Sequence, residues 1–239
     1  AILFYSTDVV RESPLVQRMI RAVVFDLDGT LIYNHTNFMK MRKCVVDELI
    51  SEGIPEEILD EDDIIVNNMA QAEKYAKENG IDVSKLYSAT GRIMSRVELE
   101  TVDLTTPVEG ALDTIISLQN ECYKTGILTR GSRQYAESAL KAANLDIEFD
   151  VFICRDDYPE EEAKPSPIAM QRAAEKMRVE VSECLYLGDH AIDMRCATAA
   201  GAKFLGVLTG AYTADEWKKI NVEYVENITS LNSLLSLEQ

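Results

Sequence analysis

The sequence predicts an α/β protein in which a mostly parallel sheet carries helices on both of its faces. Short apolar segments alternate with amphipathic helical segments through the second half of the chain, which is typical of successive βαβ units. The apolar segment 23–27 has no polar alternation, as expected for a strand that is buried on both faces. A long helical stretch separates this segment from the others, so the sheet is expected to be interrupted by an insertion.

The insertion is expected at 34–103, where the sequence has helical periodicity and no clear strand. Apolar residues recur at helical spacing over 37–51, and further helices are expected at 62–79 and 83–102. Pro55 is well placed for a first helical turn, and Gly80 is a typical residue at the end of a helix. We therefore interpret this stretch as an inserted helical subdomain.

After Pro107 and Gly110, strands and helices alternate to the end of the chain. Helices are expected at 111–121, 135–143, 167–177 and 192–200, where apolar residues follow helical spacing. Strands are expected at 126–129, 151–153, 184–187 and 204–208, with 222–225 as a further candidate. The alternation predicts that these strands are parallel to one another and to the first strand.

The composition indicates an acidic protein. Asp and Glu number 41 against 24 Lys and Arg, which gives a formal net charge of −17 at pH 7. Such a surface repels nucleic acids and anionic membranes, so neither is expected as a partner. No apolar stretch approaches the roughly 18 residues that a membrane span requires. An anionic substrate would need a locally positive pocket, made by a metal ion, a lysine or backbone amides.

The cysteines and histidines argue against three kinds of site: disulfides, structural zinc and a catalytic triad. The five cysteines are well separated and form no Cys-x-x-Cys pair, so neither a disulfide framework nor a zinc site is supported. Reduced thiols in a cytoplasmic protein are the expected state. Only two histidines are present, which weakens any triad hypothesis. The segment Met19-Ile20-Arg21 comes just before the first strand, and residues 1–18 are expected to be an extension outside the catalytic fold.

Polar residues follow apolar strands, or lie in the loops after them, at four places in the sequence. They are the pair Asp26 and Asp28, then Thr129, then Lys164, and finally the pair Asp189 and Asp193. A parallel sheet would bring all of them to one edge, where ligands of open α/β sheets bind. Each alone has an ordinary explanation, such as a solvated turn or a helix N-cap. Their occurrence together, in this order, points to a shared site.

These motifs resemble the haloacid dehalogenase (HAD) superfamily. The matching segments are Asp26-Leu-Asp28-Gly-Thr30, Leu128-Thr129, Lys164-Pro165 and Gly188-Asp189 with Asp193, within a region from about 21 to 210. Finer details resemble the phosphoglycolate-phosphatase-like branch: Pro107-Val-Glu-Gly110, Ile127-Leu-Thr-Arg130, Lys164-Pro-Ser-Pro167 and Ala199-Ala-Gly-Ala202. The resemblance implies a Rossmann-like core formed by 19–33 and 104–239, and a helical cap formed by 34–103.

The resemblance also implies catalytic roles. Asp26 is expected to be the nucleophile that forms an aspartyl-phosphate, and Asp28 the acid that protonates the leaving oxygen and then activates water. A carboxylate that approaches a phosphate dianion is repelled by it, so Mg²⁺ is expected between them. Asp26 and Asp189 would bind this ion through carboxylate oxygens, and Asp28 through its backbone carbonyl.

The remaining site residues are expected to bind the phosphoryl group or to support the others. Thr129 would donate its hydroxyl, and the backbone amides of Arg130 and Gly131 would add further donors. Lys164 would orient Asp26 and stabilise negative charge in the transition state. Asp193 is expected to hold Lys164 or a metal-bound water rather than the metal itself.

The function expected from this resemblance is Mg²⁺-dependent hydrolysis of a small phosphorylated metabolite, such as phosphoglycolate or a sugar phosphate, by a monomer or homodimer. The alternatives are a phosphomutase acting on a sugar phosphate and, more remotely, a non-enzymatic phospho-acceptor or binding protein. Asp28 argues against dehalogenation, because haloacid dehalogenases lack an acid at that position.

The helical insertion is expected to set substrate specificity. Arg42, Arg92 and Arg96 are candidates for contacting a substrate carboxylate or hydroxyls, although arginines on helices are usually solvated. Phosphonate-cleaving members of the superfamily place a Schiff-base lysine in the cap. Lys40 and Lys43 lie in the corresponding region, but Asp28 disfavours that reaction.

Overall fold

The computed structural model describes residues 20–235 of the 239-residue chain. The expected extension at 1–18 lies outside these residues. The chain divides into two compact units: a helical unit, His35–Val102, and an α/β unit formed by the described residues on either side of it. No helix in the described range is both long and apolar enough to cross a bilayer.

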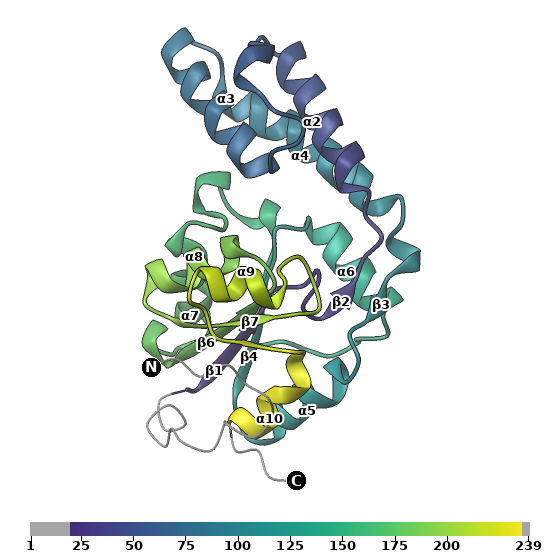
Figure 1. Cartoon of the computed structure of the whole chain (residues 1–239), viewed down its shortest axis with the longest axis vertical. Helices are drawn as coiled ribbons and strands as arrows, with labels where there is room; N and C mark the ends of the chain where they lie inside the picture. The colour runs from purple at the N-terminus through teal and green to yellow at the C-terminus, as the bar shows by residue number, and fades with distance from the viewer. Residues whose placement is uncertain (1–19, 236–239) are drawn as a thin grey trace. The chain divides into compact units, whose positions relative to one another are not determined.

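The α/β unit is built on a sheet whose six described strands are all parallel, which confirms the predicted fold class (Figure 1). In spatial order the strands are β5 (Val151–Ile153), β4 (Lys124–Leu128), β1 (Ala22–Phe25), β6 (Cys184–Gly188), β7 (Lys203–Val207) and β8 (Tyr224–Val225). The strands expected from apolar runs all occur, with ends shifted by at most two residues.

The first strand of the chain lies at the centre of this sheet. All four residues of β1 are buried, and Phe25 pairs with Ile127 of β4 on one side and Leu187 of β6 on the other. From β1 the chain builds outward through β4 to β5, and then crosses to β6 on the opposite side. The strand order therefore reverses between β1 and β6, the place where open α/β sheets form a ligand crevice.

Helices cover both faces of the sheet because the chain adds β4 and β5 on one side of β1 and then β6, β7 and β8 on the other side. Right-handed crossovers place α5 and α6 on one face and α7 and α8 on the other (Figure 1). On the second face, Ala22 and Val24 of β1 join a buried cluster with Met170 and Ala197. The helices of this unit are α5 (Ala111–Asn120), α6 (Arg133–Ala142), α7 (Pro167–Met177), α8 (Ala191–Ala200), α9 (Ala214–Lys219) and α10 (Leu231–Leu234).

The helical unit contains α2 (Phe38–Ser51), α3 (Ile65–Asn79) and α4 (Val83–Leu99). Their apolar faces meet in one buried cluster that includes Val45, Ala72 and Leu86, as the helical spacing predicts. Gly80 ends α3 in a left-handed conformation with φ 73°, which glycine adopts without steric cost. Pro55 precedes a short 3₁₀ helix, η2 (Glu56–Ile58), rather than a longer α-helix.

Several short elements were not expected from the sequence. The strands β2 (Ile32–Tyr33) and β3 (Thr106–Pro107) form an antiparallel pair, and two residues are too few to show periodicity. This pair brings the two ends of the inserted segment side by side. The helices α9 and α10 are also short, and the remaining 3₁₀ helices are η3 (Val102–Leu104), η4 (Arg155–Asp157), η5 (Glu160–Glu162), η6 (Val181–Glu183) and η7 (Ile228–Ser230).

Packing of Trp217 on the sheet gives a test of this fold. Trp217 is fully buried, and a Cβ added to Gly206 of β7 would lie 2.6 Å from its indole ring. We expect Gly206→Ala to lower the free energy of unfolding by about 1–3 kcal/mol, because overpacking displaces a rigid ring. Urea unfolding followed by the fluorescence of Trp217, the only tryptophan in the chain, measures this change.

Gly91→Ala is the matched control. Gly91 lies inside α4, where an added Cβ meets nothing within 4 Å. An alanine in a helix interior is favoured over glycine by about 0.5–1 kcal/mol, so this variant should be at least as stable as the parent by circular dichroism. Equal destabilisation by both substitutions would contradict the packing described for Trp217.

Candidate functional site

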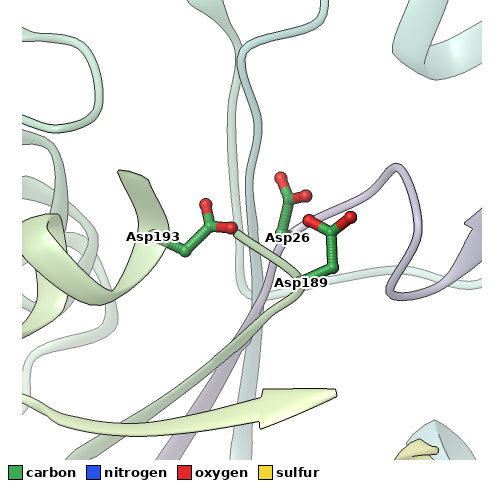
Figure 2. A group of neighbouring side chains, drawn as sticks. All are labelled: Asp26, Asp189 and Asp193. Atoms are coloured by element: carbon green, nitrogen blue, oxygen red, sulfur yellow. The ribbon is translucent and has the colours of Figure 1, made fainter. Parts of the chain in front are cut away.

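Three buried aspartates gather at the carboxyl edge of the sheet (Figure 2). Asp26 directly follows β1, Asp189 directly follows β6, and Asp193 lies in the first turn of α8. A carboxylate oxygen of each lies within 4.8 Å of the others. Adjacent parallel strands end at the same edge, so residues 163 positions apart in the sequence become neighbours.

Lys164 enters the same cluster from the loop between η5 and α7. Its side chain is 3% exposed, and its Nζ lies 2.6 Å from Asp26 Oδ1 and 2.6 Å from Asp193 Oδ1. Nζ also donates to the hydroxyl of Tyr186 at 2.8 Å. All three donor hydrogens of the ammonium group can therefore be satisfied by partners inside the protein.

Tyr186, in β6, was not identified as a site residue from the sequence. Its hydroxyl lies 2.9 Å from the carbonyl oxygen of Leu128 and 3.1 Å from Asp193 Oδ1, and it can donate to one of them at a time. In the sequence, Tyr186 is an aromatic residue in an apolar strand, so it gives no signal beyond burial. The structure makes it a support for the Lys164 ammonium group.

Two glycines make room for the carboxylate of Asp189. A Cβ added to Gly29 or to Gly210 would lie 2.4 Å or 2.0 Å from Asp189 Oδ2, distances that no side chain could occupy. Gly29 also has a φ of 73°, so its backbone conformation favours glycine as well. Oδ2 accepts a hydrogen bond of 2.7 Å from the backbone amide of Ala211. The carboxylate is thereby fixed with its other oxygen available.

The cluster contains more acidic groups than basic ones. Burial raises the pKa of Asp26 well above its usual range, and the neighbouring aspartates add to this while Lys164 opposes it. Burial together with Asp193 raises the pKa of Asp189 to about 7. For Lys164, burial alone would lower the pKa, but Asp193 and Asp26 outweigh it and raise the pKa. Three carboxylates share one lysine.

This donor set fits a hard divalent cation. Among residues 20–235, Asp26 Oδ2 and Asp189 Oδ1 take part in no hydrogen bond, so each can bind an ion. Asp193 is less available, because Oδ1 accepts from Lys164 and Oδ2 accepts from the amide of His190 at 3.2 Å. Carboxylate oxygens are the ligands that Mg²⁺ prefers, and its charge would offset the excess of acids.

Asp28 lies at the rim of this cluster and accepts two hydrogen bonds on one oxygen. Asn34 Nδ2 donates to Asp28 Oδ1 at 2.6 Å, and the phenol of Tyr135 donates to the same atom at 2.5 Å. Sequence reasoning identified neither partner. Asn34 is close to the motif and could have been suspected, whereas Tyr135 is 107 residues away on α6 and gives only a helical, buried pattern.

The predicted phosphate-binding segment follows β4. Thr129 is buried, and its Oγ1 accepts a hydrogen bond of 2.9 Å from the amide of Gly131. The guanidinium of Arg130 donates to the carbonyl oxygen of Lys164 at 2.5 Å and forms an ion pair with Glu160. The Arg130 side chain therefore secures the loop that carries Lys164.

Most of the cationic residues predicted in the helical unit have partners there or are partly enclosed, whereas Arg96 is exposed. Lys40 forms an ion pair of 2.6 Å with Glu100, and Lys43 one of 3.4 Å with Glu61. Arg92 donates to Ser88 Oγ at 2.8 Å. The Nε atom of Arg42 is buried and has no hydrogen-bond partner within the described residues. Arg96 lies in the last turn of α4.

Comparison with known proteins identifies the family. Residues 23–207 match the model of the haloacid dehalogenase-like hydrolases. The pyrophosphatase PpaX of Bacillus cereus (strain Q1) is 30% identical over 188 residues, which cover 79% of this chain and 83% of that protein. A PpaX from Bacillus anthracis (strain A0248) has the same identity and the same coverage of both chains.

Solved structures share the fold. A hydrolase from Pseudomonas syringae aligns with a TM-score of 0.65 at 24% identity, covering 90% of this chain and 98% of that one. A HAD family hydrolase from Deinococcus radiodurans R1, solved with bound phosphate and sodium, gives 0.61 at 18% identity, with coverages of 91% and 96%. A predicted phosphoglycolate phosphatase from Haemophilus somnus 129PT gives 0.60 at 16% identity, with coverages of 89% and 96%.

The chain therefore belongs to the haloacid dehalogenase-like hydrolases, as its motifs predict. Together, the family and the pyrophosphatase relatives identify this protein as a phosphatase.

Removing the ammonium group of Lys164 tests the charge balance of the site. We expect Lys164→Met to lower the free energy of unfolding by roughly 3–5 kcal/mol, because it leaves buried carboxylates without a partner. Urea unfolding in the presence of EDTA, so that no added metal compensates, measures the loss.

Lys124→Met is the control, because Lys124 forms an exposed ion pair of 2.7 Å with Asp150. Exposed pairs contribute about 1 kcal/mol or less, so this variant should lose little. If the two variants lost the same stability, Lys164 could not hold the site together as described.

Proposed function

We propose that the enzyme is a Mg²⁺-dependent phosphatase that hydrolyses a small phosphorylated metabolite through an aspartyl-phosphate on Asp26. The observation that carries this proposal is the buried contact of Lys164 Nζ with Asp26 and Asp193, beside Asp189, at the carboxyl edge of the sheet. Bound phosphate in the Deinococcus radiodurans relative lends support from the same fold.

In the first step, the carboxylate of Asp26 attacks the phosphorus atom. A bond forms between an Asp26 oxygen and phosphorus while the bond from phosphorus to the ester oxygen breaks. Lys164, at 2.6 Å from Asp26, keeps this carboxylate oriented and offsets negative charge in the transition state. Mg²⁺, when bound by Asp26, Asp189 and the backbone carbonyl of Asp28, would supply the positive charge that lets two anions meet.

Asp28 acts as the general acid in the first step and as the general base in the second. Its carboxyl group donates a proton to the ester oxygen as that oxygen leaves, and then accepts a proton from the water that attacks the aspartyl-phosphate. The second step releases inorganic phosphate and restores the carboxylate of Asp26. Asp193 accepts a hydrogen bond from Lys164 in both steps and acts as its support.

Thr129 and its neighbours are proposed to bind the phosphoryl oxygens. The amide of Gly131 donates to Thr129 Oγ1, so the oxygen is used as an acceptor and the hydroxyl hydrogen remains for a phosphoryl oxygen. On substrate binding, the backbone amide of Arg130 would add a donor, and that of Gly131 would add another by exchanging Thr129 Oγ1 for a phosphoryl oxygen. In this proposal, uncharged donors and one lysine would contact the phosphoryl group.

We also propose that 34–103 functions as the cap of the core formed by 19–33 and 104–239, and that it selects the substrate. Arg42, Arg92 and Arg96 are its candidate contacts to a carboxylate or hydroxyl group. The names of the relatives suggest which substrates to compare: pyrophosphate for the PpaX proteins and phosphoglycolate for the Haemophilus somnus protein. Sugar phosphates complete the screen, with kcat/KM as the measure.

The nucleophile is tested by Asp26→Asn. We expect this variant to lose at least roughly 10³-fold in phosphate release from p-nitrophenyl phosphate with Mg²⁺, because an amide cannot form the intermediate. Acid-quenched wild-type enzyme should carry a phosphoryl group on the peptide that contains Asp26, as detected by mass spectrometry.

Asp146→Asn, at an exposed position, controls for the loss of a carboxylate as such and should be fully active. Undiminished turnover by Asp26→Asn would exclude the proposed nucleophile. Isomerisation of a sugar phosphate without net phosphate release would instead favour a phosphomutase.

The metal requirement is tested by binding as well as by activity. We expect Mg²⁺ to raise the melting temperature of the wild-type protein, because an ion that binds only the folded state stabilises that state. At a Mg²⁺ concentration of 100 times the dissociation constant, the free energy of unfolding rises by about 2.7 kcal/mol. Asp189→Asn should abolish most of this shift, while Asp146→Asn should keep it. EDTA should stop turnover and added Mg²⁺ should restore it. A shift of the same size in Asp189→Asn would contradict the ligand set.

A further inference from the structure

We propose that Tyr135 is a positioning residue that orients Asp28 for its proton transfers. This inference rests on the proposed function and extends it to a residue outside the four motifs. Tyr135 donates its phenol hydrogen to Asp28 Oδ1 at 2.5 Å. It comes from the first turn of α6, and Asp28 from the loop after β1, so the contact joins two distant parts of the chain.

The position of Tyr135 is tightly fixed. The residue is 1% exposed, and its backbone amide donates to Ser132 Oγ, the N-cap of α6, at 3.3 Å. The ring packs on the backbone of Gly131, where an added Cβ would lie 2.8 Å from Cδ1. The phenol thus has little freedom to follow Asp28 if the carboxyl group rotates, and it can hold that group in one orientation.

The contact assigns different tasks to the two oxygens of Asp28. Oδ1 accepts from both Tyr135 and Asn34, which leaves no room for a proton on that atom. The transferable proton therefore belongs on Oδ2. In the first step, this proton passes from Oδ2 to the ester oxygen while the bond from that oxygen to phosphorus breaks and the bond from Asp26 to phosphorus forms. Without the phenol, the carboxyl group could rotate away from this arrangement.

The test compares two leaving groups in Tyr135→Phe. An alkyl alkoxide, as from glycerol 2-phosphate, needs the proton in order to leave, whereas p-nitrophenolate leaves readily without it. We expect kcat/KM to fall about tenfold for glycerol 2-phosphate, within the range that general acid catalysis supplies. For p-nitrophenyl phosphate we expect a loss of less than about twofold, because protonation contributes little there. Equal losses on both esters would overturn the proposal, since a general disturbance of the site lowers both.

A double-mutant cycle provides a second measurement. Asp28→Asn should itself lower kcat/KM more for the alkyl ester than for the aryl ester. If Tyr135 acts through Asp28, Tyr135→Phe should cause no further loss in the Asp28→Asn background. Losses that multiply in the double variant would overturn the proposal.

Two further variants complete the design. Tyr123→Phe removes a phenol from a partly buried tyrosine on the loop after α5 and should change neither rate. If Tyr135→Phe did not fold, Asn34→Ala, which removes another donor to Oδ1, should give a smaller loss that again depends on the leaving group, and a uniform loss would overturn the assignment of Oδ1. Failure of the proposed function would look different: the wild-type enzyme would hydrolyse neither ester.

Discussion

The contact between Lys164 and Asp26 is the interaction on which the rest of the site depends. A buried ammonium group is costly to desolvate, and so is a buried carboxylate, yet each makes the other tolerable at 2.6 Å. Asp193 and Tyr186 complete the shell of the lysine, and Arg130 secures its loop. One lysine does not balance three carboxyl groups, so the cluster can accept a further positive charge. A divalent cation is the partner that its oxygen donors suit best.

The parallel sheet makes this contact possible. With β1 between β4 and β6, the residues that follow three adjacent strands must emerge at one edge. The strand order reverses beside β1, the place where open α/β sheets generally bind ligands, because the next crossovers leave on opposite faces. The short pair β2 and β3 brings the ends of the insertion together, so a whole helical unit can be inserted without disturbing the edge that holds the aspartates.

Three glycines and one tyrosine determine how closely the side chains of the site approach one another. Gly29 and Gly210 make room for the carboxylate of Asp189, and Gly131 makes room for the ring of Tyr135. The glycines allow backbone and side chains to approach more closely than any Cβ would permit, and the hydroxyl of Tyr135 donates a hydrogen bond to Asp28. Rigid support of this kind keeps reacting groups in a productive orientation without further ordering when substrate binds.

The sequence by itself determined the α/β class, the buried strands, the main helices and the family, because apolar periodicity and short motifs are local properties of the chain. It also marked Asp26, Lys164, Asp189 and Asp193, which the structure brings together. Only the tertiary structure revealed Tyr186 beside Lys164, Tyr135 beside Asp28, and the antiparallel pair at the ends of the insertion. Those contacts join residues far apart in the chain, and a buried tyrosine in a strand or helix looks the same in sequence whether its hydroxyl meets a carboxylate or a carbonyl group.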